Sequence, residues 1–276
     1  MLHNILACLN PRRIPGVLAA IDRVELRDDA QIGKQHDRIL ATLGVLAACL
    51  FIAHYAKYQT SFLSVLAWCS TVTGHEAFHF RHQLWESGWL EGAGYVWWTG
   101  VLVTCYLLVP ALVIRLWWRD RLAHYGLAWT GQRGHWVGYL VLISPILLFA
   151  VLASFRPDFQ QHYPFYTQAG RSWLDLTAWW ACYCLQFLCL EFFFRGFILR
   201  ALSPTIGWRA IPVMAVPYVM IHFEKPWLEA LGALPFGLAL GVLALRSGSI
   251  WGGVLVHCTL AITMDALALT HANSWP

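Results

Sequence analysis

The sequence predicts an all-α, polytopic membrane helix bundle with about seven or eight transmembrane helices. Of its 276 residues, 58% are hydrophobic and only 12% are charged, whereas soluble domains carry about 25% charged residues. Apolar runs long enough to cross the hydrocarbon core of a bilayer recur along the chain. Many of the 16 tryptophans stand near the ends of these runs, as expected at the two membrane surfaces.

The first residues differ from the rest of the chain. Segment 1–38 mixes basic and acidic residues with apolar ones, and we expect it to be an amphipathic segment on the cytoplasmic face. Residues 39–276 then form the transmembrane domain. The net charge of +4 comes from loop arginines and lysines, so we expect a lipid bilayer as partner and no nucleic acid.

Seven apolar runs are expected to cross the membrane: 39–56, 95–118, 136–154, 173–199, 211–222, 229–245 and 249–269. Run 61–73 is apolar but short for a span, so we expect an interfacial or re-entrant piece there. Run 229–245 is rich in glycine and other small residues and is expected to pack closely on its neighbours. Basic residues concentrate in alternate loops, which predicts a cytoplasmic N-terminus and an external C-terminus, as in a bacterial inner-membrane protein.

The stretch LEFFFRGFILR at 190–200 is unusual because it places two charged residues inside an apolar run. Ionisable residues within membrane spans are rare and mark functional sites by default. Glu191 and Arg195 are four residues apart, so on a helix they share one face and can form an ion pair. The alternative is a purely structural ion pair that fixes helix packing.

Three further polar residues occur in the late spans. His222 ends the run VPYVMIH, His257 lies in the middle of the last span, and Asp265 follows two helical turns after it. Each alone is explained as a packing residue. Together with Glu191 and Arg195 they are a set of side chains suited to catalysis, and we expect Glu191, Arg195, His222 and His257 to meet in one site.

These residue types allow hydrolysis without a covalent intermediate. A carboxylate in apolar surroundings beside an arginine can be a general base that activates water together with one histidine. The other histidine can donate a hydrogen bond to the oxyanion of the tetrahedral intermediate. No serine in these spans has an obvious base partner.

Three motifs resemble those of the CPBP family of intramembrane proteases (CAAX protease and bacteriocin-processing, also called Abi). They are LEFFFRGFILR, YVMIHFEKP and SIWGGVLVHCTLAITMD, and the upstream RLAHYGL at 121–127 also fits, so the family-like core covers about 121–269. The resemblance implies a helical bundle with a conical cavity and a membrane-anchored protein or peptide as substrate. By the same resemblance, Glu191 and His222 bind the attacking water, and His257 with its helix partner supports the oxyanion.

The sequence departs from the family pattern at two positions. The family's first motif begins with two glutamates, and the first, usually assigned to water activation, is replaced here by Leu190. Glu191 is therefore expected to act as the base, from a position about 100° around the helix. Four residues after His257 the family has a polar partner, but this chain has Ala261, and Asp265 follows one turn later and is expected to fix the helix or tautomer of His257.

Two other functions remain open. His75, Glu76 and His79 spell HEAFH, which matches the H-E-x-x-H pattern of zinc proteases, in which two histidines on one helical face bind the metal. Zinc would be the cofactor of that alternative, whereas the glutamate hypothesis predicts none. The third possibility is a catalytically inactive membrane scaffold, which the loss of the first glutamate favours. A transporter finds little support, because no internal repeat is evident.

Overall fold

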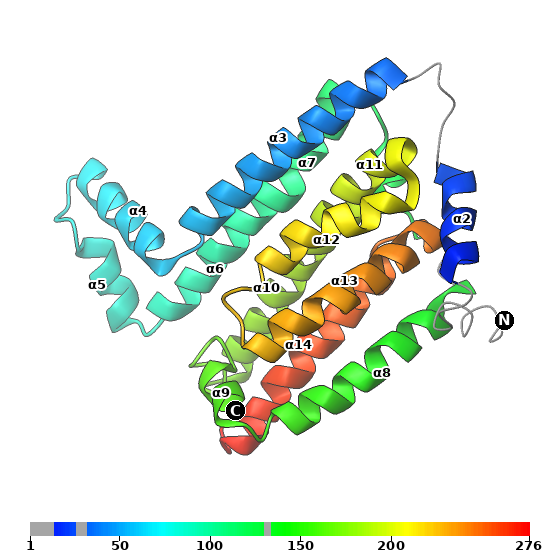
Figure 1. Ribbon diagram of the computed structural model, residues 1–276. Coiled ribbons are helices and arrows are strands. Elements are labelled where there is room, and N and C mark those ends of the chain that lie inside the picture. The colour runs from blue at the N-terminus through cyan, green and yellow to red at the C-terminus, as the bar shows by residue number, and fades with distance from the viewer. Residues whose placement is uncertain (1–13, 26–31, 130–133) are drawn as a thin grey trace.

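The computed structural model describes residues 14–25, 32–129 and 134–276, which form helices and short connections without a strand. Figure 1 shows the long helices running roughly side by side, with the C-terminus at one end of the bundle. Six stretches among the described residues are long and apolar enough to cross a membrane: Asp37–Ala56, Leu90–Trp117, Trp136–Ala153, Trp173–Met220, Trp227–Ser247 and Trp251–His271. The all-helical membrane fold expected from the composition is confirmed.

The stretch Trp173–Met220 contains a reversal and so supplies two of the expected runs. It rises through α10 (Trp173–Glu191), η6 (Phe192–Ile198) and α11 (Leu199–Ile206), turns at η7 (Gly207–Arg209), and returns as α12 (Ala210–Met220) (Figure 1). Gly207 has φ +59° at the turn, a conformation that suits glycine. Each of the seven runs expected to cross therefore corresponds to a helical segment.

The remaining long helices surround this stretch. They are α3 (Ile32–Ala56), α6 (Leu90–Leu102) continued by η2 (Val103–Leu108), α7 (Val109–Leu112) and η3 (Val113–Trp117), then α8 (Trp136–Ala153), α13 (Trp227–Ser247) and α14 (Trp251–His271). Within the apolar window of Trp173–Met220, 72% of residues are buried, against 17% to 50% in the other five stretches. The segment with the charged motif is thus the centre of the bundle.

The second span begins at Leu90 rather than near residue 95. Glu91 and two glycines make residues 90–94 look like a loop in the sequence. Glu91 stands in the first turn of α6, where a carboxylate interacts favourably with the helix dipole. It also accepts hydrogen bonds from the backbone N–H and the hydroxyl of Thr167, at 2.8 and 2.6 Å, so its polar side chain is satisfied without ending the helix.

The apolar run 61–73 falls in α4 (Gln59–Val72), which pairs with α5 (His79–Glu86). Figure 1 shows this hairpin beside one end of the bundle. With 14 residues, α4 is about 21 Å long, which is shorter than a hydrocarbon core of about 30 Å. It is not among the six stretches that meet the length and composition of a membrane span.

The small residues of α13 pack closely against α12, as the sequence predicts. A Cβ atom at Gly237 would lie 2.7 Å from the ring of Tyr218, and one at Gly241 would lie 2.8 Å from Ile211. Glycine at these two positions lets α12 and α13 approach. This contact fixes where Tyr218 is held.

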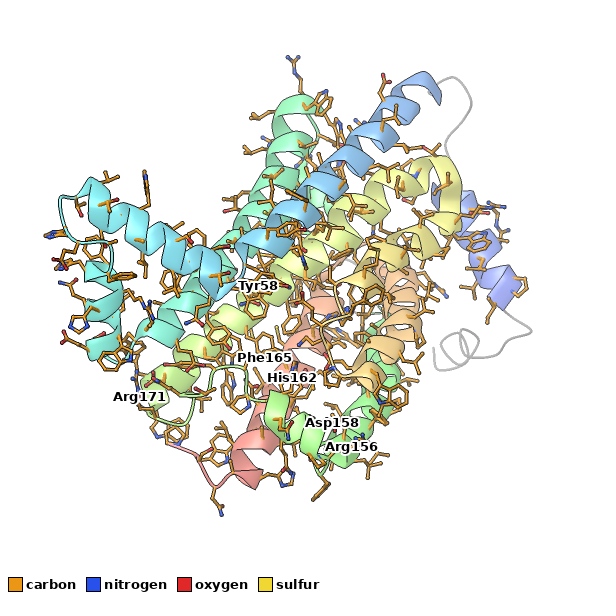
Figure 2. The ribbon with its side chains drawn as sticks, turned by 60° about the vertical axis from the view of Figure 1, so that its left-hand side comes forward. Tyr58, Arg156, Asp158, His162, Phe165 and Arg171 are labelled. Atoms are coloured by element: carbon orange, nitrogen blue, oxygen red, sulfur yellow. The ribbon has the colours of Figure 1, made fainter. Side chains whose placement is uncertain are left out.

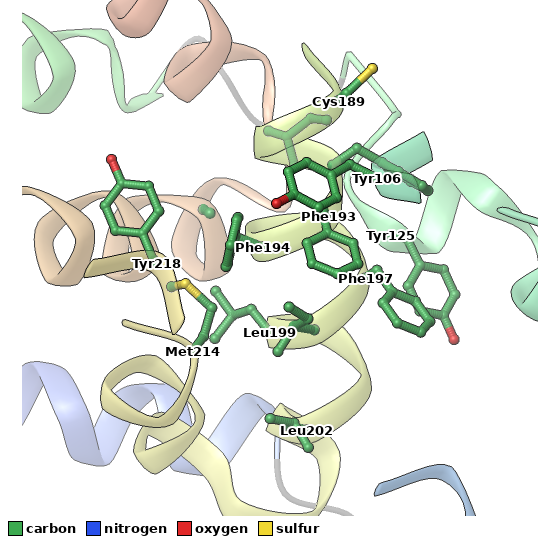
Figure 3. Close-up of a cluster of buried hydrophobic side chains, with 14 of the residues drawn as sticks. Tyr106, Tyr125, Cys189, Phe193, Phe194, Phe197, Leu199, Leu202, Met214 and Tyr218 are labelled. Carbon is green, nitrogen blue, oxygen red and sulfur yellow. The ribbon is translucent and has the colours of Figure 1, made fainter. Parts of the chain in front are cut away.

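Aromatic residues form the core around the charged motif. Phe193 stacks on Tyr106 with a centroid distance of 4.5 Å, and Phe197 stacks on Trp118 at 5.4 Å. Figure 3 shows Phe193, Phe194 and Phe197 projecting from the central segment, with Tyr218 at the edge of the cluster and its hydroxyl directed away from Met214. The segment η6 is a wider π-type helix, a feature that often occurs at functional sites.

The other described segments cover the ends of the bundle. They are α2 (Ile14–Glu25), η4 (Leu122–Tyr125) and α9 (Pro157–His162). The helix α2, within the segment expected to be amphipathic, packs on the turn at η7, where Asp22 accepts a hydrogen bond from the backbone N–H of Trp208 at 2.9 Å.

Candidate active site

The ion pair expected within LEFFFRG is formed. One guanidinium nitrogen of Arg195 lies 3.1 Å from Oε1 of Glu191, and the two side chains are 0% and 1% exposed. Glu191 is the last residue of α10 and Arg195 lies one turn on, in η6. A buried charge requires a partner of opposite charge nearby, and this local spacing supplies it.

His257 of α14 contacts the same carboxylate. Its Nδ1 lies 3.1 Å from Oε1 of Glu191 and 3.1 Å from the backbone carbonyl of Gly253, one turn earlier in α14. A Cβ atom at Gly253 would lie 2.2 Å from Oε2 of Glu191. Glycine is therefore needed for α14 to approach the carboxylate of α10.

Tyr218 connects the remaining parts of the site, although the sequence gives little sign of it. Its hydroxyl lies 3.1 Å from Nε2 of His257, and the guanidinium of Arg195 lies 4.0 Å from the centroid of its ring. Its backbone carbonyl lies 2.7 Å from Nδ1 of His222. The sequence indicates a role for this tyrosine only by its place in an apolar run, one helical turn before a candidate histidine.

His222 joins the site through Tyr218, from a position just beyond the end of α12 at Met220. No hydrogen bond or ion pair in the described part of the chain connects it directly to Glu191. Because the carbonyl of Tyr218 can only accept, Nδ1 of His222 carries the hydrogen and Nε2 remains an acceptor. Burial lowers the pKa of His222 to about 4, so its imidazole is neutral at physiological pH.

A cavity of about 1490 Å³ opens at these residues. Its lining includes Tyr218, His222, His257 and Leu190. Glu191 and Arg195 are absent from the lining and lie behind His257. From the sequence, Glu191 itself is expected to contact the attacking water. In the structure Leu190 faces the cavity, and the neighbouring Glu191 is turned toward Arg195 and α14 instead.

The cavity is mostly apolar away from the histidines, with walls from α3, α8, α10, α13 and α14. Charged groups line parts of its margin. Glu224 accepts a hydrogen bond from Lys57 at 2.7 Å and another from Tyr58, which joins the end of α3 to the loop after α12. Lys225 lies over the ring of Phe165 at 3.8 Å. Figure 2 shows Phe165 with His162 and Asp158 at this end of the bundle.

Asp265 lies apart from the imidazole of His257. Its Oδ2 accepts a hydrogen bond from the indole N–H of Trp179 at 2.7 Å, and the residue is fully buried. This bond ties α14 to α10. The groups that contact Nδ1 of His257, and so bear on its tautomer, are Glu191 and Gly253 instead.

The HEAFH motif lacks the helix that a zinc site of this type requires. His75 and Glu76 stand in the connection after α4, and α5 begins only at His79. The imidazoles of His75 and His79 stack with centroids 4.1 Å apart. In residues 14–25, 32–129 and 134–276, no group of three or more His, Cys, Asp or Glu residues is arranged to hold a metal ion. His75 and His79 therefore do not share one helix, unlike the two histidines of a helical H-E-x-x-H motif.

The upstream motif RLAHYGL contacts both halves of the site. Gly126, with φ +84°, accepts a hydrogen bond from the backbone N–H of Ile250 at 3.0 Å, just before α14. The carbonyl of Tyr125 lies so close to η6 that a Cβ atom at Gly196 would be 2.7 Å away. The glycine of LEFFFRG is thus the contact point for this loop.

Comparison with protein-family models matches residues 171–263 to the family described as type II CAAX prenyl endopeptidase, Rce1-like. The matched region contains Glu191, Tyr218, His222 and His257. Residues 171–263 are therefore similar to the Rce1-like proteins of the CPBP family. The resemblance drawn from the three motifs is confirmed, and the match indicates a membrane endopeptidase of the CAAX-protease type. Comparisons with curated proteins and with solved structures found no match.

Proposed function

We propose that this Rce1-like protein hydrolyses a peptide bond of a membrane-anchored protein or peptide, using water activated by His257 and Glu191. The observation that supports this most strongly is the buried Glu191–His257 contact, in which His257 also lines the large cavity. The apolar walls of the cavity suit an acyl, prenyl or peptide anchor. The polar end at Tyr218, His222 and His257 then receives the bond to be cut.

In this mechanism His257 is the general base. Both groups near its Nδ1 are acceptors, so Nδ1 carries a hydrogen and Nε2 is the basic nitrogen, which takes a proton from water once its hydrogen bond with Tyr218 is broken. The carboxylate of Glu191 stabilises the imidazolium ion that forms, as the acidic member of a catalytic triad does. Glu191 therefore remains essential, but it acts on water through His257 instead of directly.

His222 and Arg195 have supporting roles. The neutral His222 offers Nε2 to the cavity as a second acceptor, which can hold and orient the attacking water. Arg195 holds the carboxylate of Glu191 in its charged form within the apolar interior. Asp265 keeps α14, and with it His257, fixed against α10.

An inactive scaffold is the alternative, and Leu190 is the observation that favours it. Leu190 lines the cavity where the family pattern has its first glutamate. If a carboxylate must touch the water, this chain cannot cleave. Our proposal requires instead that His257, backed by Glu191, suffices as the base.

Proteomic analysis of membrane-protein termini tests the proposal even though the substrate is unidentified. Cells carrying the wild type are compared with cells carrying Glu191→Gln, and we expect a set of new termini that the variant lacks. Asp175→Asn is the matched control, because Asp175 is also 1% exposed and pairs with an arginine four residues away, Arg171, at 2.6 Å. If the termini of wild type and Glu191→Gln are the same, the protein is not a protease of this type.

A further inference from the structure

The hydroxyl of Tyr218 is the polar group closest to the candidate base on the cavity side. It lies 3.1 Å from Nε2 of His257 and belongs to a residue that lines the cavity. The other side chains packed on His257 there are Phe187 and Phe236, each with a ring centroid 5.1 Å away. Neither has a hydrogen-bond donor, and Ala261, one turn after His257, has none either.

The direction of the Tyr218–His257 hydrogen bond follows from the other contacts of the imidazole. Because Nδ1 faces Glu191 and the carbonyl of Gly253, it carries the ring hydrogen. In the neutral imidazole Nε2 is then an acceptor, so the hydroxyl of Tyr218 is the donor in the resting state.

We propose that Tyr218 is a catalytic residue whose hydroxyl donates a hydrogen bond to the oxyanion of the tetrahedral intermediate. This inference rests on the proposed function. Water must replace the hydroxyl of Tyr218 at Nε2 of His257 before Nε2 can accept its proton, and this exchange frees the O–H group of Tyr218 for another acceptor. The oxyanion forms in the same cavity at that moment, and it is the strongest new acceptor there.

The steps balance without a further reagent. An O–H bond of water breaks as its proton moves to Nε2, and the water oxygen bonds to the substrate carbonyl carbon. The electron pair of the C=O π bond moves to oxygen, which then accepts the hydrogen bond from Tyr218. When the intermediate collapses, the C=O bond reforms, the C–N bond breaks, and the leaving nitrogen takes the proton from Nε2.

The position of the hydroxyl is fixed before substrate binds. The ring of Tyr218 is held by the guanidinium of Arg195, 4.0 Å from its centroid, and by the close backbone of α13 at Gly237. Phe194 packs edge-on with a centroid distance of 5.5 Å. Because the ring is held in place, only the O–H bond has to turn from Nε2 to the oxyanion, and a donor that reorganises this little stabilises developing charge effectively. The positive charge of Arg195 beside the phenol also polarises its O–H group.

Tyr218→Phe tests the proposal, because it removes the hydroxyl and keeps the ring that packs on Arg195. Tyr139→Phe is the matched control: Tyr139 is buried and contacts Ser247 at 3.3 Å, but it does not line the cavity. The four proteins to compare in membranes are wild type, Glu191→Gln, Tyr218→Phe and Tyr139→Phe. Termini that depend on Glu191 identify a cleaved sequence, and a peptide spanning it gives kcat and KM for each purified protein.

We expect Tyr218→Phe to lower kcat by about 10²-fold, with KM and the thermal unfolding temperature close to those of Tyr139→Phe. If Tyr218→Phe keeps kcat within about threefold while Glu191→Gln is inactive, the role of Tyr218 is wrong and the proposed function stands. A loss confined to KM, or one matched by a lower unfolding temperature than that of Tyr139→Phe, would also overturn it. If wild type and Glu191→Gln have the same termini, the proposed function and this inference both fail.

Discussion

Nδ1 of His257 lies 3.1 Å from Oε1 of Glu191, so a single contact joins the middle of α14 to the end of α10. The carboxylate is shared between this imidazole and the guanidinium of Arg195. Glu191 does not line the cavity, but His257 does, so the contact between them connects the carboxylate of Glu191 to a substrate bound there. A substitution at Glu191 or Arg195 should therefore alter activity by way of the imidazole.

Arg195→Lys should damage both stability and activity. A lysine keeps the charge but loses the planar guanidinium that lies over the ring of Tyr218. In this fully buried position we expect a loss of about 1–3 kcal/mol in unfolding free energy and a lower kcat/KM. Thermal unfolding in detergent measures the first, with Arg156→Lys as control, because Arg156 pairs with Asp158 in solvent. Equal unfolding temperatures for the two variants would contradict the role of Arg195.

Stability should fall as the pH is lowered from about 7 to 4, in part because of His222. Burial lowers the pKa of His222 from its ordinary value near 6.5 to about 4. Between these values the unfolded chain binds a proton that the folded protein does not. The neutral imidazole therefore contributes stability that is complete above pH 6.5 and lost progressively toward pH 4, by about 3 kcal/mol in total. The dependence should be shallower in His222→Asn, as measured by thermal unfolding at several pH values. Identical slopes would show that the pKa of His222 is not lowered in the folded protein.

His75→Ala and His79→Ala should leave cleavage unchanged within about twofold, because their imidazoles stack on each other outside the candidate site. Metal chelators should likewise have little effect. The measurement is the appearance of Glu191-dependent termini in cells that carry each variant. Loss of these termini in both variants, together with zinc-restored activity in chelated wild type, would place the zinc mechanism first.

Topology reporters fused after Asp120 and Pro276 should report opposite sides of the membrane. Asp120 lies 3.8 Å from Arg38, near the start of the first span, whereas the C-terminus is at the other end of the bundle (Figure 1). Basic residues near the first end predict that it is cytoplasmic. Reporters on the same side would show that one of the seven passes, most simply the short α12, does not cross.

The local features of the site could be predicted from the sequence. Glu191 and Arg195 are four residues apart in one helix, and this spacing alone brings them together. His257 stands out because polar residues are rare in apolar spans and tend to meet there. The positions of the membrane-spanning helices can be predicted from the lengths of the apolar runs. The start of the second span at Leu90 is the exception, because Glu91 hydrogen-bonds to Thr167, a loop residue distant in sequence.

Features that depend on how helices face one another could not be predicted. The choice of Leu190 over Glu191 as the residue facing the cavity is set by the rotation of α10 against α14, which the sequence does not encode locally. Tyr218 escapes notice because a tyrosine in an apolar run resembles any other packing residue. Its role depends on distances to His257 and Arg195, which lie on other helices.

A double-mutant cycle on Glu191 and His257 tests the central claim most directly. The measurement is kcat/KM of the purified protein in lipid nanodiscs, with a peptide spanning a bond whose cleavage depends on Glu191. We expect Glu191→Gln and His257→Ala each to lower kcat/KM by about 10²- to 10³-fold. The double variant should be no worse than the less active single variant, since the two residues act as one unit. Full activity in Glu191→Gln, or losses that multiply in the double variant, would contradict a base formed by His257 and Glu191 together.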